Sequence, residues 1–147
     1  MENSSLIYTI GHSNRSLDKF IDILKFFRIE TLIDVRRFPK SIYNPQFNKE
    51  NLNIILPQSN IEYFWIEKLG GFRKGGYLEY MNSKEFKEGL KRLIEIAKKK
   101  KSAIMCAEIL WFECHRRFIS EKLASLGFKI VHIYDKNKIY EHKTLQL

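Results

Sequence analysis

Five short apolar segments of the chain are rich in β-branched and aromatic residues, and each is followed by glycine or a charged residue. The stretches between them carry apolar residues every three or four positions, which is the spacing of an amphipathic helix. The pattern therefore predicts strands that alternate with helices. The predicted strands cover residues 6–10, 31–35, 61–66, 103–107 and 129–134.

The first two predicted helices lie between the first three strands. An apolar stripe runs over residues 17–27, and Ser16 directly before it can cap the helix N-terminus. The second helix is expected to begin near Asn48. We expect it to stop before Pro57, because proline has no backbone N–H to donate inside a helix.

Two further helices are predicted in the second half of the chain. Asn82 followed by Glu85 resembles a capping box, and it precedes an apolar stripe over residues 86–97. Residues 114–125 form the last predicted helix, which Gly127 can end because glycine favours the C-terminal cap.

Strand–helix alternation with mostly apolar strands is typical of a parallel sheet that is covered on both faces. The chain has 147 residues, which is the usual size of one domain, and no shift in composition marks a boundary. We therefore predict an α/β fold: a single domain over residues 1–147, with a mostly parallel five-stranded sheet and helices on both faces.

Chemically reactive residues follow several of the predicted strands. Parallel sheets of this kind bind ligands beyond the carboxyl ends of their strands. We therefore expect His12, Arg36, Glu108 and Cys114 to line one pocket at that edge. The candidate phosphate or substrate contacts are Gly11, Ser13, Arg36, Cys106, Trp111, His115, Arg116, Arg73 and Lys74.

Two of these motifs suit acid–base or phosphate chemistry. Gly11, His12 and Ser13 can form a tight turn that aims backbone N–H groups at an anion, and a histidine can exchange protons near neutral pH. Asp34 and Arg36 are two residues apart on a strand, so their side chains share a face. They form either a structural ion pair or part of a site. In such a site, Arg36 binds a phosphate and Asp34 orients it, or Asp34 is itself the acid–base or electrostatic carboxylate.

The cysteines suit a different chemistry. Cys114 is at a predicted helix start beside His115 and Arg116, which favours a lowered pKa and a nucleophilic thiolate. Cys106 and Cys114 could instead be small buried apolar residues. Together with His115 and His12 they could also bind zinc, but their spacing matches no standard zinc motif. We predict no metal ion and no other cofactor.

The aromatic and histidine residues near the expected pocket have interpretations of their own. Trp111 and Phe112 could stack on bases, although aromatic residues in such positions more often cover a core. His132 lies inside an apolar strand and is expected to be a hydrogen-bonded core histidine. His142 lies in the tail, so the two are not expected to cluster.

The net charge is +9, which favours a polyanionic partner. A glycine-rich loop that carries Arg73 and Lys74 suits phosphate contact, so we expect nucleic acid, and DNA more than RNA, as the partner. A lysine-rich surface that serves solubility or heat resistance is the alternative.

No apolar run approaches the ~18 residues that span a bilayer, and two cysteines do not form a disulfide framework. We therefore expect a cytoplasmic protein that does not bind membranes.

Taken together, the motifs resemble the family called domain of unknown function 488. The resemblance covers nearly the whole chain and implies a compact bacterial or archaeal α/β domain, without implying an activity. Members of that family tend to have a polar stretch between the two cysteine motifs, where this chain has the apolar residues 109–112. The motifs are Thr9-Ile10-Gly11-His12-Ser13, Asp34-Val35-Arg36, Leu69-Gly70-Gly71, Cys106-Ala107-Glu108, Cys114-His115-Arg116 and His132-Ile133.

Three hypotheses for the function follow. The leading one is a nucleic-acid-processing enzyme that hydrolyses a glycosidic or phosphodiester bond of DNA in repair or modification, with His12, Asp34 or Glu108 in acid–base roles. The absence of a carboxylate cluster in the sequence argues against a two-metal nuclease. The alternatives are a thiol-dependent enzyme with Cys114 as nucleophile toward a sulfur- or phosphate-bearing substrate, and a non-catalytic nucleic-acid-binding module.

Overall fold

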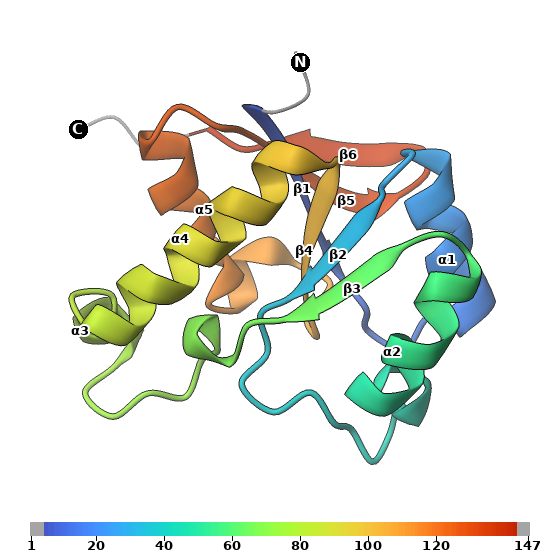
Figure 1. Cartoon of the computed structure of the whole chain (residues 1–147), viewed down its shortest axis with the longest axis horizontal. Coiled ribbons are helices and arrows are strands. Elements are labelled where there is room, and N and C mark those ends of the chain that lie inside the picture. Colours follow the sequence, from blue (N-terminus) through green and yellow to red (C-terminus); the bar gives the residue numbers. More distant parts are fainter. Residues whose placement is uncertain (1–4, 144–147) are drawn as a thin grey trace.

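A computed structural model describes residues 5–143, so the two ends of the predicted domain, 1–4 and 144–147, lie outside the described residues. Strands and helices alternate along most of the chain (Figure 1). The strands are β1 (Leu6–Gly11), β2 (Thr31–Asp34), β3 (Glu62–Trp65), β4 (Ser102–Cys106), β5 (Lys129–Asp135) and β6 (Lys138–Glu141). The α-helices are α1 (Leu17–Phe26), α2 (Lys49–Gln58), α3 (Tyr77–Tyr80), α4 (Lys84–Lys99) and α5 (Arg116–Ser125). Short 3-10 turns are η2 (Pro45–Phe47), η3 (Glu67–Leu69) and η4 (Trp111–Glu113).

The strands form one six-stranded sheet in the order β3-β2-β4-β1-β5-β6. Neighbouring strands from β3 to β5 pair in parallel, and β6 pairs with β5 in the antiparallel sense. The predicted α/β fold with a mostly parallel sheet is therefore confirmed, with one more strand than expected. The register matters for the site, because Gly11 at the end of β1 lies opposite Cys106 at the end of β4.

Helices cover both faces of the sheet, as predicted. Figure 1 shows α1 and α2 on one side of the strands and α4 and α5 on the other. One core packs Phe20 of α1 and Leu52 of α2 against Met105 of β4. The other packs Phe86 of α4 and Leu123 of α5 against strand residues that include Cys106. Successive strand residues point to opposite faces, so Met105 and Cys106 belong to different cores.

Two predicted helix boundaries differ from the structure. α2 continues through Pro57 and ends one residue later, because a proline in the last turn removes only one helical hydrogen bond. α4 is capped by Ser83 and not by Asn82, since the Ser83 hydroxyl accepts a hydrogen bond from the backbone N–H of Phe86. Both differences are one or two residues in size.

The unexpected strand is β6, which follows β5 through the two-residue turn Lys136–Asn137. A two-residue connection is the commonest link between antiparallel strands. All four residues of β6 are exposed, so the alternation of buried and exposed positions that identifies a strand is missing there. The tail of the chain thereby becomes the edge of the sheet.

The carboxyl ends of β1 and β4 are packed together at backbone level. A Cβ atom added to Gly11 would lie 1.7 Å from the carbonyl oxygen of Glu108 and 2.8 Å from Cα of Ile109. The residue at this position must therefore be glycine if the loop after β4 is to cross the end of β1. This contact places the Cys106–Cys114 connection over the sheet edge.

We predict that Gly11→Ala lowers the free energy of unfolding by more than about 2 kcal/mol, because a backbone atom cannot rotate away from the added methyl group. Gly127→Ala is the matched control. Gly127 has φ +99°, but nothing lies within 4 Å of the added carbon, so only backbone strain of about 1 kcal/mol is expected. Urea denaturation of both variants measures the difference. Equal losses would show that the loop after β4 yields freely.

Candidate functional site

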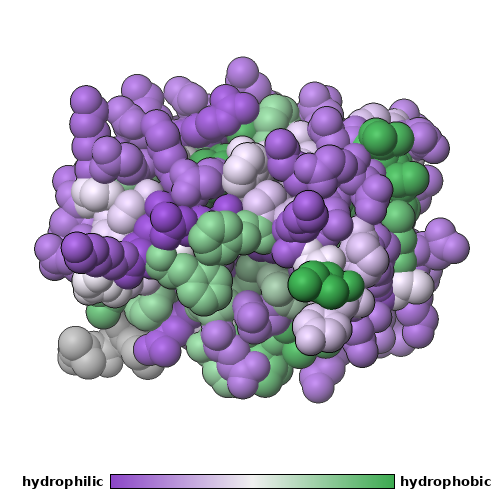
Figure 2. All heavy atoms as spheres, turned by 90° about the horizontal axis from the view of Figure 1, so that it is seen from below, coloured by the Kyte–Doolittle hydropathy of each residue, from purple (hydrophilic) through white to green (hydrophobic). Residues whose placement is uncertain are grey.

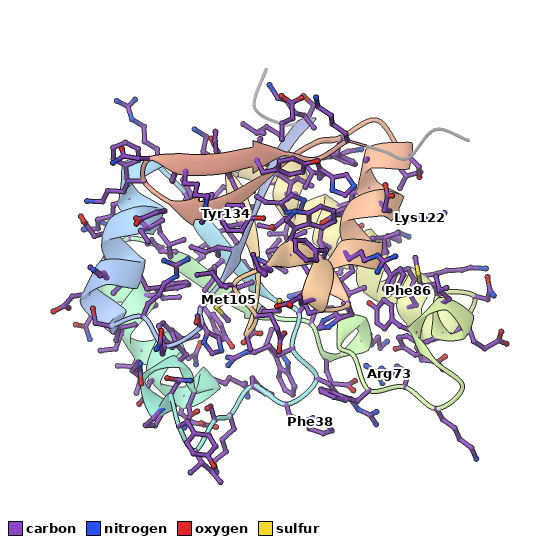
Figure 3. The ribbon with its side chains drawn as sticks, turned by 180° about the vertical axis from the view of Figure 1, so that it is seen from behind. Phe38, Arg73, Phe86, Met105, Lys122 and Tyr134 are labelled. Atoms are coloured by element: carbon purple, nitrogen blue, oxygen red, sulfur yellow. The ribbon has the colours of Figure 1, made fainter. Side chains whose placement is uncertain are left out.

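The loops after β1, β2 and β4 meet at the carboxyl edge of the sheet. The carboxyl ends of β2, β3 and β4 point toward the lower side of Figure 1, and Figure 2 shows that side, where apolar side chains gather in the middle of a hydrophilic surround. Phe38 and Arg73 lie along this edge, whereas Tyr134 and Lys122 lie above it (Figure 3). Two groups of polar residues meet here, and they differ in chemistry.

The first group is the ion pair of Asp34 and Arg36. The Asp34 carboxylate is fully buried and accepts four hydrogen bonds: from the backbone N–H, Nε and Nη2 of Arg36 at 3.1, 2.9 and 2.7 Å, and from the Tyr63 hydroxyl at 2.5 Å. Arg36 Nη2 also donates to the carbonyl of Phe47 at 2.7 Å. Burial lowers the pKa of Arg36, but the hydrogen bonds and the charge of Asp34 outweigh it, so the pKa is raised. The pKa of Tyr63 is also raised, and burial is the main cause there. These contacts describe a structural pair, which is one of the two interpretations left open by the sequence.

His12 is packed against this pair. Its ring stacks on Phe47 with centroids 4.6 Å apart, and Nη1 of Arg36 lies 3.3 Å from Nε2. Because an arginine can only donate, Nε2 accepts, and Nδ1 must carry the proton that it donates to the carbonyl of Ser13 at 2.8 Å. Burial lowers the pKa of His12 to about 4. The imidazole is therefore neutral at neutral pH, with both nitrogens engaged.

The turn after β1 does not offer its N–H groups to an anion. The N–H of His12 donates to the carbonyl of Cys106 at 2.9 Å, and the N–H of Ser13 donates to that of Ala107 at 2.8 Å. The expected phosphate contact of the Gly11–Ser13 backbone is thus wrong for these two groups. They extend the pairing of β1 with β4 instead.

The second group is the cysteine pair. The Sγ atoms of Cys106 and Cys114 are 2.7 Å apart. Cys106 is 1% exposed, and burial raises the pKa of its thiol well above the ordinary value. The pKa of Cys114 is lowered, first because the Cys106 thiol donates a hydrogen bond to it, and also because the nearby Arg116 guanidinium and backbone N–H stabilise the thiolate. Of the two thiols, Cys114 is therefore the one that loses its proton more readily.

The cation beside this pair is Arg116, which is 1% exposed. Its Nη2 donates to the carbonyls of Glu108 and Ile109 at 2.9 and 3.3 Å, and its Nε has no hydrogen-bond partner. Within residues 5–143, no carboxylate forms an ion pair with it. Arg116 lies beneath the site and lines neither cavity there, so the expected phosphate contact is not available. Its charge acts on the sulfurs.

α5 begins at Arg116, two residues later than predicted, and Cys114 precedes it in extended conformation. His115 is the residue before the helix. Its Nε2 donates to the carbonyl of Val35 at 2.6 Å, and burial lowers its pKa. Its Nδ1 faces Gly71, where a Cβ would be only 3.0 Å away. Val35 and Gly71 thus fix the orientation of this ring beside the cysteines.

A metal ion has one candidate site among the described residues. A carboxylate oxygen of Glu108 and the two cysteine sulfurs lie within 4.8 Å of one another. Two thiolates on a tetrahedral zinc ion, with Zn–S bonds of about 2.3 Å, are roughly 3.8 Å apart. The sulfurs at 2.7 Å are closer than that, so their present arrangement does not suit a shared metal ion.

A cavity of about 590 Å³ opens over the cysteine pair. It is lined by residues of the three loops after β2, η3 and β4, together with the end of β4, α3 and the start of α5, among them Arg36, Glu108, Cys114 and His115. His12 does not share it: a neighbouring cavity of about 390 Å³ contains His12, Ser13 and Lys40. Arg36, Phe38 and Ala107 line both. We expected His12 to line the same pocket as the cysteines, and this expectation is wrong. His12 and Asp34 lie on the face of the sheet that packs against Phe47, whereas the cysteines lie on the opposite face.

Residues 16–123 match the family model described as Domain of unknown function DUF488. The chain belongs to the DUF488 family. No curated protein and no solved structure matches it. The family match includes the ion pair of Asp34 and Arg36 and both cysteines, whereas His12 and the strand β5 lie outside the matched range.

The aromatic residues of the loop between the cysteines are divided between two environments. Phe112 lines the cavity and is 49% exposed. Trp111 turns away and stacks on His132, with centroids 4.4 Å apart and planes at 5°. The expectation that Trp111 contacts substrate is therefore wrong. The ring fastens the loop to β5, because its large apolar surface is covered there by His132 and Tyr140.

His132 is a hydrogen-bonded core histidine, as expected, but the expectation that it does not cluster with His142 is wrong. His142 Nε2 donates to Glu121 at 3.0 Å, so its Nδ1 accepts from Nε2 of His132 at 2.9 Å. Nδ1 of His132 then accepts from the Thr9 hydroxyl at 2.6 Å. The β5–β6 hairpin produces this chain of contacts by bringing the tail back beside β5.

We expected Arg73 and Lys74 of the glycine-rich loop to contact phosphate, and Arg73 does not match this expectation. Arg73 donates to the carbonyls of Gly70 and Glu67, pairs with the Glu67 carboxylate at 3.1 Å and lies 4.2 Å from the centroid of the Tyr80 ring. It therefore holds the loop together. Lys74 is exposed.

Across residues 5–143, no helix is both long and apolar enough to cross a membrane.

The buried histidines predict a pH dependence of stability. Burial lowers the folded-state pKa of His12 to about 4 and that of His132 to about 3, below the unfolded value of 6.5. The unfolded chain therefore binds protons first as the pH falls. The stability that the two neutral histidines contribute is fully present above pH 6.5. It is lost as the pH falls from 6.5 toward the folded pKa values of about 4 and about 3. Each histidine contributes a slope of roughly 1.4 kcal/mol per pH unit well inside the window.

Urea denaturation between pH 7.5 and 5 measures this loss. His132→Gln, which cannot titrate, should reduce the slope by about 1 kcal/mol per pH unit. The same slope in the wild type and the variant would contradict the assignment of a neutral His132.

Proposed function

We propose that this protein is a thiol-dependent enzyme in which Cys114 is the nucleophile and Cys106 is its partner thiol. The observation that carries the proposal is the 2.7 Å separation of the two sulfurs at the floor of a cavity open to solvent. Two cysteine sulfurs this close can join in a disulfide when oxidised. A pair of merely structural cysteines needs neither the neighbouring cavity nor the neighbouring cation.

Three features single out Cys114. It is more exposed than Cys106, its pKa is lowered while that of Cys106 is raised, and it accepts the backbone N–H of Arg116 at 3.4 Å. A thiolate stabilised by a helix N-terminus and an arginine is the usual form of a reactive cysteine. Cys106 lies beside it and is placed to attack the Cys114 sulfur once a substrate sulfur is bound there.

The reaction that uses both residues is reduction of an electrophilic sulfur. The Cys114 thiolate attacks a substrate S–X bond, a Cys114–substrate disulfide forms, and X leaves with the electron pair. The Cys106 thiol then loses its proton to solvent and attacks Cys114, which forms the Cys106–Cys114 disulfide and releases the substrate thiolate. The substrate gains two electrons from the protein dithiol, and a small-molecule thiol restores the dithiol by exchange.

The hydrolytic hypothesis receives less support from the same contacts. All hydrogen bonds of the Asp34 carboxylate go to Arg36 and Tyr63, and both nitrogens of His12 are engaged. A general base needs a free lone pair within reach of its substrate. Of the three acid–base candidates, Glu108 alone is exposed on the wall of the larger cavity.

A nitrobenzoate disulfide reagent, dithiobis-nitrobenzoate, tests the proposal. Its aromatic, anionic halves are coloured once released. The reduced wild type should release two coloured thiolates per chain and finish as a Cys106–Cys114 disulfide. Cys106→Ser should release one and retain a stable mixed disulfide, because no resolving thiol remains. Cys114→Ser should react at least about tenfold more slowly, since Cys106 is buried. Absorbance and intact mass measure both quantities.

Arg116→Gln and Arg116→Lys form the matched control pair. Removing the charge should slow the reaction of Cys114 about tenfold at neutral pH by lowering the thiolate fraction, and lysine should restore part of the rate. Thermal unfolding checks that both variants fold. A wild type that keeps one reagent group on Cys114, or a Cys114→Ser protein that reacts as fast as the wild type, would overturn the proposal.

A further inference from the structure

The cavity over the cysteines is unusually rich in rings. Tyr77 stacks on Phe118 with centroids 5.8 Å apart, and these rings form its inner wall. Phe38 and Phe72 stand at its mouth with centroids 6.1 Å apart, exposed by 61% and 84%. Phe112 lines it from the loop after β4 and is 49% exposed. Exposed rings around a cavity are a stacking surface for a planar ligand.

The charges on the cavity wall are of both signs. Arg37 and Arg117 line it together with Glu108 and Glu113. Arg37 is fixed in place because its Nη1 donates to the carbonyl of Phe72. Arg117 is exposed, and none of the ion pairs within residues 5–143 includes it. A ligand that suits this wall has an anionic group, a flat ring and N–H donors.

We propose that this cavity binds a nucleotide, with its base stacked on Phe112 and the rings at the mouth, and its phosphate held by Arg117. Glu108 and Glu113 supply acceptors for the amino or imino groups of a base, as acidic residues do in base recognition. The inference rests on the proposed function, because it names the substrate class of the same cavity. The electrophilic sulfur is then carried by a nucleotide, either free or within a single strand.

Size supports one nucleotide unit. The cavity volume of about 590 Å³ lies within the ~300–1,000 Å³ range of small-ligand sites. A base must leave its stack to enter such a space, so a single strand or a free nucleotide fits and a paired base does not. A zwitterionic peptide disulfide would also match the mixed charges, but it would leave the rings at the mouth without a planar partner.

Isothermal titration of the reduced protein tests the proposal without using its chemistry. The probes are adenylate, uridylate, ribose phosphate, inorganic phosphate, oxidised glutathione and a short thymidine oligonucleotide. A mononucleotide should bind at least about fivefold more tightly than ribose phosphate, since stacking of one base is worth about 1–3 kcal/mol. Tighter binding of the oligonucleotide than of the mononucleotide, counted per site, would identify a strand as the source of the nucleotide.

Variants assign the contacts. Phe112→Leu should weaken nucleotide binding about fivefold and leave phosphate binding unchanged, whereas Arg117→Gln should weaken both. Tyr43→Leu is the matched control, because Tyr43 is 91% exposed but does not line the cavity, and it should change neither. Both Phe112 and Tyr43 are exposed, so their replacement leaves the core intact.

The outcomes separate this inference from the proposed function. Nucleotide binding that Phe112→Leu weakens supports the inference even if the dithiol releases only one coloured thiolate, which would refute the thiol chemistry alone. Release of two coloured thiolates without nucleotide binding would refute the inference alone. Oxidised glutathione that binds more tightly than any nucleotide, or nucleotide binding insensitive to both Phe112→Leu and Arg117→Gln, would also overturn it.

Discussion

The buried guanidinium of Arg116, which has no carboxylate partner among residues 5–143, is the constraint on which the site depends. Removing the charge of Arg116 from water is costly, and carbonyl oxygens compensate for it only in part. The Arg116 guanidinium lowers the pKa of both cysteine thiols, although burial leaves the pKa of Cys106 raised. The same side chain holds the backbone of Glu108 and Ile109, so one interaction fixes both the loop and the charge state of the sulfurs.

The ion pair of Asp34 and Arg36 is the opposite case. Its charges are neutralised within the pair and its hydrogen bonds are satisfied, so it costs little once formed and offers no free charge. Its position still matters, because Arg36 lines both cavities at the sheet edge. Arg36 therefore contributes a wall whose charge is already neutralised, and the two cysteines line the same cavity.

The sequence was sufficient for the five parallel strands of the sheet and for the edge at which the site lies. Apolar runs identify buried parallel strands, and strand direction then places Asp34 and Cys106 at the same edge. Pattern alone could not show which of two adjacent aromatic residues faces the cavity, because Trp111 and Phe112 are equally apolar. It also missed the exposed strand β6, and with it the partner of His132. Burial of Arg116 was equally invisible, since arginine is normally a surface residue.

The loop between the cysteines links recognition to reactivity. Arg116 holds its first residues, Trp111 anchors its middle to β5, and Cys114 ends it, so only Phe112 among its rings remains free to meet a ligand. The apolar residues of this loop therefore differ in what they contact. Trp111 packs on His132 and Tyr140, whereas Phe112 stays exposed on the cavity wall. Under the proposed nucleotide binding, Phe112 is the ring that meets the base, while the anchors keep Cys114 in position.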